Sequence, residues 1–348
     1  MRMTRSSQPS PLNLRIGEVV EVRSQEEILA TLDRNGELES LPFMPEMLQF
    51  CGRRFRVYRR AIKLCDTINW TGMHRMENTV HLESLRCDGQ AHGRCQAGCL
   101  LYWKEAWLKR VEPHAADPAD KGARPAAVTV PDTGPQAVSS RTVDTLLAAT
   151  RADGGRDGPG NETFSCQATE LMRAAPVRIP WWDPRQYLRD VRVGNARIGA
   201  MIRFLIIMLF NKFQGANRRF LPRLPLIHGA TNYPFIDGKL TTTPKEVLNL
   251  QPGELVEVKP KEEILRTLDK NHKNRGLKFD IEMLRYSGQR ARVLRRVDHI
   301  IDESTGKMMH FANDCIILDG VACRSEYYGF CPRSTYPYWR EIWLKRVE

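Results

Sequence analysis

The chain contains an internal duplication. Residues 14–112 align with residues 250–348 without a gap when the sequence is shifted by 236 positions, and 41 of the aligned pairs are identical. The strings GEVVEVRSQEEILATLD and YWKEAWLKRVE of the first copy return, slightly changed, at the two ends of the second. Matched ends indicate a complete folding unit of about 100 residues, so the sequence predicts two copies of one small domain.

Each copy shows short apolar alternations that are typical of β-strands, with one inserted helix. Val20 and Val22 alternate with acidic neighbours, and the string FRVYRR alternates again further on. Between them, Ser24 and Glu27 have the spacing of a capping box at the start of a helix. The sequence therefore predicts a mainly β fold with inserted helices (α+β), in which each copy is a small, partly open barrel.

The EEIL helix after the first strand and the PEML turn before a Val-rich strand resemble the SH3-like repeats of Mind-bomb-type ubiquitin ligases. That resemblance implies two tandem SH3-like barrels joined by a helical middle segment. The strings RCDGQAHGRCQAGC and YWREIWL are more similar to a bacterial family of cysteine-containing tandem repeats, and this second resemblance implies no activity.

The segments outside the two copies differ in composition. Residues 1–13 are expected to be a disordered N-terminus, and residues 113–162 are rich in Pro, Ala and Gly, as linkers are. Within that linker, Arg141–Thr150 can form a helix. Residues 163–249 are apolar, aromatic and basic, and we expect a helix over Asn195–Gln214 that ends before Gly215.

The surplus of positive charge lies in this middle segment. The chain has 53 Lys and Arg against 41 Asp and Glu, a formal net charge of +12. Eleven basic residues but only Asp183 and Asp190 fall between Arg173 and Arg223, around the apolar string IRFLIIMLF. The predicted helix is short for a membrane span, which needs about 20 apolar residues, and it contains an arginine.

Two interpretations of this helix remain open. It is either a core helix with exposed arginines or an interfacial helix that lies on an anionic membrane surface with its basic residues at the headgroups. The second interpretation predicts contacts through Arg197, Arg203, Lys212, Arg218 and Arg219. Nucleic acid is not expected as a partner, because the apolar residues are aliphatic and continuous instead of aromatic and interleaved with charge.

The first copy contains a candidate metal site in its cysteines. The alignment of the copies superposes Cys87 on Cys323 and Cys95 on Cys331, so two thiols keep one separation in both halves. The predicted ligands of the first site are Cys65, Cys87, Cys95 and Cys99, with His92 as the rival for the fourth place.

The second copy departs from this pattern, since Cys65 aligns with Ile301 and Cys99 with Thr335. Its predicted ligands are Cys315, Cys323 and Cys331, and a fourth comes from His310, His299 or Cys166. The spacing does not distinguish zinc from an iron–sulfur cluster, or either from reduced thiols packed as small apolar groups without a cofactor.

The sequence favours a binding protein over an enzyme. It has no phosphate loop, dinucleotide fingerprint, nucleophile elbow or HExxH helix, and Trp103, Trp107, Trp339 and Trp343 are expected in the cores of the barrels. The N-terminal residues lack the apolar core of a secretory signal, which predicts a cytoplasmic protein with reduced thiols.

We therefore expect a non-catalytic, metal-stabilised tandem-barrel binding or scaffold protein with an unidentified protein partner, docked at the cytoplasmic membrane face. The alternative is an iron–sulfur redox protein or oxidoreductase component that uses the cysteine clusters.

Overall fold

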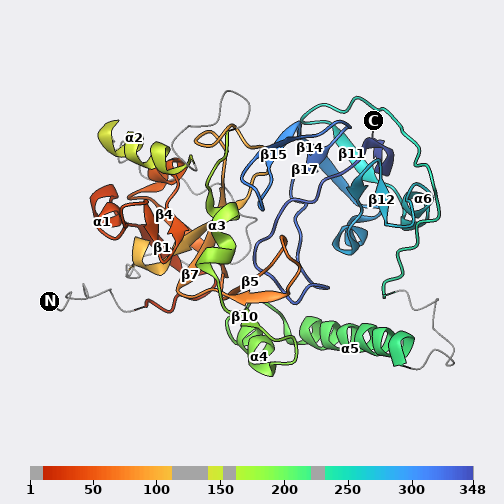
Figure 1. Ribbon diagram of the computed structural model, residues 1–348, viewed down its shortest axis with the longest axis horizontal. Coiled ribbons are helices and arrows are strands. Elements are labelled where there is room, and N and C mark those ends of the chain that lie inside the picture. Colours follow the sequence, from red (N-terminus) through yellow and green to blue (C-terminus); the bar gives the residue numbers. More distant parts are fainter. Residues whose placement is uncertain (1–10, 112–139, 152–161, 221–231, 348) are drawn as a thin grey trace, which may run out of the picture. The chain divides into compact units, whose positions relative to one another are not determined.

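The computed structural model describes residues 11–111, 140–151, 162–220 and 232–347 (Figure 1). The chain divides into two compact units. The first contains Met1–Arg94, Leu100–Ile179 and Glu303–Lys307, and the second contains Cys95–Cys99, Pro180–Asp302 and Met308–Glu348. Each unit is thus built around one sequence copy, and each includes a few residues of the other copy.

The first unit is built on a five-stranded antiparallel sheet in the order β8-β7-β4-β1-β9. Its strands are β1 (Val19–Val22), β4 (Arg54–Arg60), β7 (Thr79–Arg86), β8 (Leu100–Lys104) and β9 (Leu108–Arg110). The smaller strands are β2 (Glu37–Leu38), β3 (Leu41–Pro42), β5 (Lys63–Cys65), β6 (Met73–Arg75) and β10 (Arg178–Ile179). Its helices are α1 (Gln25–Leu29), α2 (Ser140–Ala149), α3 (Gln167–Ala174) and the 3-10 turns η1 (Pro45–Phe50) and η2 (Glu105–Trp107).

The second unit repeats this plan with a four-stranded sheet in the order β17-β14-β11-β18. Its strands are β11 (Leu255–Val258), β14 (Arg290–Arg296), β17 (Ile316–Leu318), β18 (Leu344–Arg346) and the pairs β12 (Lys273–Asn274) with β13 (Leu277–Lys278) and β15 (His299–Ile301) with β16 (Met308–His310). Its helices are α4 (Pro184–Arg192), α5 (Ile198–Phe220), α6 (Lys261–Leu265) and the 3-10 turns η5 (Ile281–Tyr286) and η6 (Glu341–Trp343).

The strand register confirms the duplication. Val20 lies opposite Phe55 and Arg110 in the first unit, and Val256 lies opposite Ala291 and Arg346 in the second, which are the aligned positions. The two copies differ at one edge, because β8 has a single isolated bridge as its counterpart, between Ile316 and Trp339. The structure is mixed α+β, mostly sheet with few helices, as predicted, and one sheet curls into a half-barrel.

The predicted core tryptophans are confirmed: Trp103, Trp107, Trp339 and Trp343 have no exposed surface. In the first unit the indole of Trp107 donates to Thr31 and meets Phe43 edge-on, with ring centroids 5.2 Å apart. In the second unit Trp343 repeats the bond, to Thr267. These four indoles pack against aromatic rings or hydroxyls inside closed cores, so they do not form an exposed wall for a ligand.

The expectations for the segments outside the copies have mixed outcomes. Most of the predicted linker 113–162 and residues 1–10 lie outside the described residues, but the helix predicted at Arg141–Thr150 is confirmed as α2. The predicted end of the long helix before Gly215 is wrong, since α5 continues to Phe220. A glycine inside a helix costs only about 1 kcal/mol, and the side chains of Gln214 and Asn217 on either side are buried.

Candidate functional site

Helices α4 and α5 contact each other in the second unit (Figure 1). Together their described residues carry six exposed large apolar side chains, one on α4 and five on α5. Asp183 caps α4 by accepting a hydrogen bond from the N–H of Arg185 at 2.9 Å, and Pro184 begins the helix. One side of α5 is buried, where Met201 and Phe204 pack against Tyr187 and Phe330. The core contact on this side holds α5 on the unit.

A second side of α5 carries an exposed apolar stripe, which we define as Ile198, Ile202, Ile206, Leu209 and Phe213. These side chains are between 53% and 66% exposed. Their spacing of three and four residues places them on one face of the helix, over about 22 Å of its length. An exposed, continuous apolar face of this kind is unusual for a soluble protein and indicates an interaction surface.

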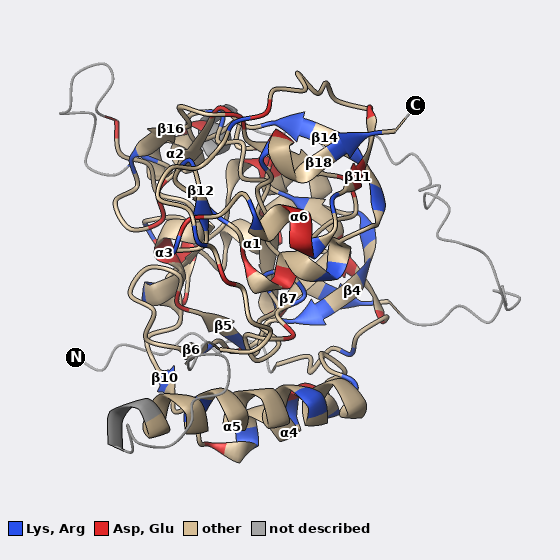
Figure 2. Cartoon of the chain, turned by 90° about the vertical axis from the view of Figure 1, so that its right-hand side faces the viewer, with Lys and Arg blue, Asp and Glu red and all other residues tan. Residues whose placement is uncertain are grey.

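Basic side chains lie on both flanks of the stripe. At 3.6 residues per turn, Arg203 projects on one side of it and Lys212 on the other. Arg203 donates to the hydroxyl of Tyr327 at 3.0 Å, and the ammonium of Lys212 lies 4.8 Å from the ring centroid of Trp181. Helix α5 contains no Asp or Glu (Figure 2). The apolar stripe is therefore bordered by fixed positive charge.

The other predicted anion contacts are placed in part. Arg197 is exposed and immediately precedes α5, whereas the side chains of Arg218 and Arg219 lie outside the described residues. Trp182, which precedes α4 and which the sequence placed at a membrane or domain interface, is 68% exposed, and Leu188 of α4 is 70% exposed. We call the stripe together with Trp181, Trp182, Leu188, Arg197, Arg203 and Lys212 the α4–α5 surface.

By length and hydropathy, residues Ile198–Asn217 of α5 could cross a membrane: their most apolar 18-residue window has a mean hydropathy of 1.3, and 17% of that window is buried. The helix is longer than the sequence analysis predicted, so its length does not exclude a span. The buried contacts of Met201 and Phe204 with the rest of the unit argue for a helix that stays on the protein.

The structure brings two of the predicted metal ligands of the first copy together. Cys87 and His92 lie beside Glu46 in the first unit. Among the described residues, these three side chains form a group whose possible metal-ligand atoms lie within 4.8 Å of one another. Cys65 is at the end of β5 in the same unit. Cys95 and Cys99 belong to the second unit, where the sulfur of Cys95 accepts from the N–H of Ile301 at 3.3 Å.

Among the described residues, the predicted ligands of the second copy form no group of three with close ligand atoms. Cys315 packs in an apolar cluster with Val297 and Ile317, and burial raises the pKa of its thiol to about 12. Burial also raises the pKa of Cys323 to about 12, and its sulfur lies 3.3 Å from the hydroxyl of Ser325. Cys331 has no exposed surface.

The candidate fourth ligands lie in different places. His299 and His310 face each other across β15 and β16, with ring centroids 5.6 Å apart, and Cys166 precedes α3. Both four-ligand sets stay predictions.

Glu46 is the member of this group that sequence reasoning missed. Its aligned partner in the second copy is Glu282, so the carboxylate is one of the identical pairs. That identity was the available signal, but an acidic residue in the first turn of a helix is normally explained by capping.

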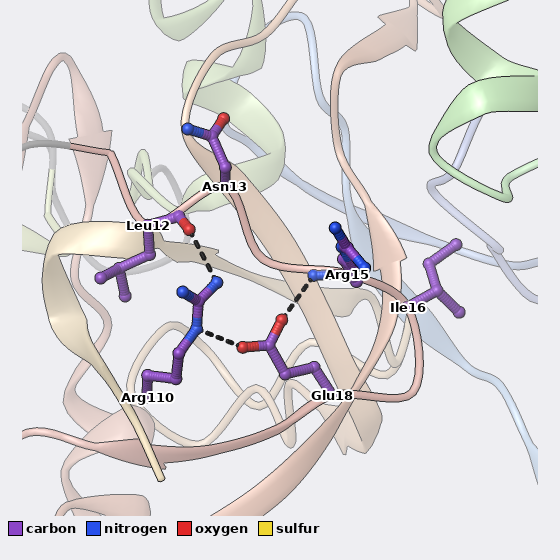
Figure 3. A pocket seen from close by; sticks show the side chains of 6 residues that line it. All are labelled: Leu12, Asn13, Arg15, Ile16, Glu18 and Arg110. Carbon is purple, nitrogen blue, oxygen red and sulfur yellow. Dashed lines mark hydrogen bonds and ion pairs between the residues drawn. The ribbon is translucent and has the colours of Figure 1, made fainter. Parts of the chain in front are cut away.

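A surface pocket of about 620 Å³ lies at the start of the first copy, lined by Leu12, Asn13, Arg15, Ile16, Glu18 and Arg110 (Figure 3). Arg110 donates to Glu18 and to the carbonyl of Leu12 in this pocket. In the second unit Arg346 makes the same contacts with Glu254 and Leu248. The pocket is thus a structural feature of the repeat.

Comparison of the chain with protein-family models, curated proteins and solved structures found no match.

The carboxyl of Glu282 gives a prediction for pH dependence. Burial raises its pKa to about 7, against hydrogen bonds from the N–H groups of Tyr327 and Glu326. A raised pKa means that the folded protein favours the protonated form of Glu282. The stabilisation of the folded protein by this protonated carboxyl is complete below about pH 4.5 and is lost as the pH rises through 7. We expect Glu282→Gln to raise the free energy of unfolding by on the order of 2 kcal/mol at pH 8 and to leave it unchanged at pH 4. Urea unfolding at the two pH values measures this, and equal effects at both would contradict it.

Proposed function

We propose that this chain is a non-catalytic binding protein that docks on an anionic membrane surface through the α4–α5 surface, with each sequence copy forming a small SH3-like barrel. The observation that carries the proposal is the exposed stripe of five large apolar side chains on α5. Burying such side chains contributes about 1.5 to 3 kcal/mol each, so leaving all five in water is costly.

The charge around the α4–α5 surface favours an anionic membrane as its partner. Arg203 and Lys212 border the stripe, Arg197 precedes the helix, and α5 contains no acidic side chain. An apolar face bordered by cations matches the boundary between acyl chains and anionic headgroups, where each basic residue contributes about 1 kcal/mol. Exposed tryptophans such as Trp182 prefer the same boundary, since the ring is apolar and the indole N–H is polar.

The contacts of α5 fit a helix that lies in the membrane interface better than a helix that crosses the membrane. Met201 and Phe204 would have to leave Tyr187 and Phe330, and the buried polar side chains of Gln214 and Asn217 would enter hydrocarbon. Lying flat, the helix keeps these contacts and submerges only the stripe. The proposal therefore places the protein on one face of a membrane.

Co-sedimentation of the full chain with vesicles tests the proposal. We expect the protein to pellet with vesicles rich in phosphatidylserine and to stay in the supernatant with pure phosphatidylcholine. High salt should weaken binding, because the Debye length falls from about 10 Å at 0.1 M to about 3 Å at 1 M. Equal binding to both lipids, or no binding to either, would overturn the proposal, as would concentration-dependent dimerisation that hides the stripe.

A further inference from the structure

The first unit contains a cluster of three chemically different side chains that the α4–α5 surface does not involve. Glu46 comes from η1, Cys87 directly follows β7, and His92 lies in the loop after it. The sulfur of Cys87 lies 3.1 Å from Oε1 of Glu46 and 3.4 Å from Nε2 of His92. Nδ1 of the same imidazole lies 3.6 Å from Oε1 of Glu46. The thiol, imidazole and carboxylate therefore meet at one point.

The local backbone holds the cluster in place. Gly89 and Gly93 have φ angles of +74° and +66°, which let the loop turn tightly on both sides of His92. Thr150, at the end of α2, donates to the carbonyl of Ala91 at 2.9 Å, and α2 also contacts η1. The same helix thus contacts both chain segments that supply the carboxylate and the imidazole.

The cluster leaves polar atoms unsatisfied inside the protein. The side chains of His92 and Glu46 are 2% and 4% exposed. Nδ1 of His92 and Oε2 of Glu46 are buried without a hydrogen-bond partner among the described residues. A buried polar atom without a partner is unfavourable, so a cation bound by these side chains would relieve that cost.

The second copy shows what the same positions look like without an imidazole. His92 aligns with Tyr328, whose hydroxyl donates to Asp280 at 2.8 Å. Glu282, aligned with Glu46, accepts from the N–H of Tyr327 at 2.6 Å, and Cys323, aligned with Cys87, has the hydroxyl of Ser325 beside it. Each of these side chains in the second copy has a protein partner, and among the described residues Oε2 is buried without a hydrogen bond in Glu282 as in Glu46. The two copies therefore differ at the imidazole, whose Nδ1 is unsatisfied in the first copy only.

We propose that Glu46, Cys87 and His92 bind one Zn²⁺ ion and that the second copy has lost this site. Zinc takes thiolate, imidazole and carboxylate ligands in tetrahedral geometry at about 2.0 to 2.3 Å, which places ligand atoms about 3.3 to 3.8 Å apart. The sulfur of Cys87 lies 3.1 Å from Oε1 of Glu46 and 3.4 Å from Nε2 of His92, and one ligand atom from each of the three side chains lies within 4.8 Å of the others, so a small closure of the cluster would reach these distances. A thiolate disfavours Mg²⁺ and Ca²⁺, which prefer oxygen ligands alone. On binding, Cys87 releases its thiol proton to solvent.

Three protein ligands leave the fourth position of the tetrahedron for water or an exchangeable ligand. The site belongs to the first unit, so it is independent of the proposed membrane docking and can fail or succeed separately.

Titration with Zn²⁺ against a chromophoric chelator, using metal-stripped full-length protein, tests the site. We expect one tight equivalent in the wild type. His92→Ala and Cys87→Ser should weaken it by at least about 100-fold, because changing even a residue behind a ligand costs 10-fold to 100-fold. Cys323→Ser, the matched change in the second copy, should leave it intact. Loss of the ion in Cys323→Ser, or its retention in His92→Ala, would overturn the proposal.

A spectroscopic measurement keeps the test decisive if a variant folds poorly. Co²⁺ bound by a thiolate gives an intense sulfur-to-metal absorption band in the near ultraviolet, in addition to the visible bands of a tetrahedral ion. We expect both in wild-type protein and in Cys323→Ser. In Glu46→Gln, which keeps the thiol, the sulfur band should persist with weaker binding. Wild-type protein that binds Co²⁺ without the sulfur band would contradict the assignment of Cys87.

Discussion

Replacing Ile202 and Ile206 together by serine is expected to lower partitioning onto anionic vesicles about 100-fold. Both side chains belong to the α5 stripe and are 53% and 62% exposed. Each loses about 1.5 to 3 kcal/mol of transfer free energy, and 1.4 kcal/mol corresponds to a factor of ten in binding. Vesicle co-sedimentation over a range of lipid concentrations measures the change.

This variant separates docking from folding. Serine and isoleucine have similar helix propensities, and exposed substitutions usually change stability by less than about 0.5 kcal/mol. Val247→Ser is the matched control, since Val247 is 64% exposed in the same unit but lies outside α5. Vesicle binding that is equally weakened by Val247→Ser, or unaffected by the double substitution, would contradict a specific role for the stripe.

Replacing Glu341 by alanine is expected to destabilise the second unit by about 3 kcal/mol. Its buried carboxylate accepts from Arg296 at 2.6 Å and from the N–H groups of Leu248, Asn249 and Leu250. Removing it leaves these donors unsatisfied, and breaking a buried pair costs about 3 to 5 kcal/mol. Because the guanidinium of Arg296 is partly exposed, we expect an effect at the lower end of this range. Hydrogen exchange measured by mass spectrometry should show faster exchange in β11, β14 and β18.

The contribution of Glu341 to the free energy of unfolding changes with pH in the opposite direction to that of Glu282. Burial would raise the pKa of Glu341, but Arg296 and the three N–H groups lower it overall. The charged form is thus favoured in the folded protein, so this stabilisation is present above about pH 4.5 and is lost on further acidification. Glu341→Gln should flatten the stability profile in acid.

In the first unit Glu105 accepts from Arg60 in the same way, so Glu105→Ala should speed hydrogen exchange in β1, β4 and β9 instead. Unchanged exchange in either unit would contradict the structural role of these carboxylates.

The duplicated sheets were predictable because local pattern determines them. Alternating Val20 and Val22, the Ser24–Glu27 capping box and the paired tryptophans all hold in the structure at the expected places. These features depend on residues close in sequence and on burial of large side chains, which a single sequence shows directly. The length of α5 was not predictable from Gly215, since the contacts of its buried side offset the cost of the glycine.

The proposed metal ligands were harder to predict because they depend on how distant segments meet. Cys87 and His92 were candidates from their motif, but Glu46 is 41 residues earlier and joins them only through the packing of η1. Likewise, Cys87 and Cys95 are neighbours in sequence, yet they belong to different compact units. Spacing identifies which residues can bind a metal, and the fold decides which of them meet.

Quenching of tryptophan fluorescence by brominated lipids tests the docking of the α4–α5 surface most directly, because the bromine atoms quench only rings that reach the acyl chains. Trp181 and Trp182 are exposed beside α5, and the four core tryptophans are buried. Trp70 of the first unit is 71% exposed but lies outside the α4–α5 surface, so it is replaced by Phe in every protein compared. Anionic brominated vesicles should quench part of the emission of the Trp70→Phe protein, and this quenching should disappear in Trp181→Phe/Trp182→Phe. Emission that stays unchanged at saturating lipid, or quenching that survives in the double variant, would contradict the account.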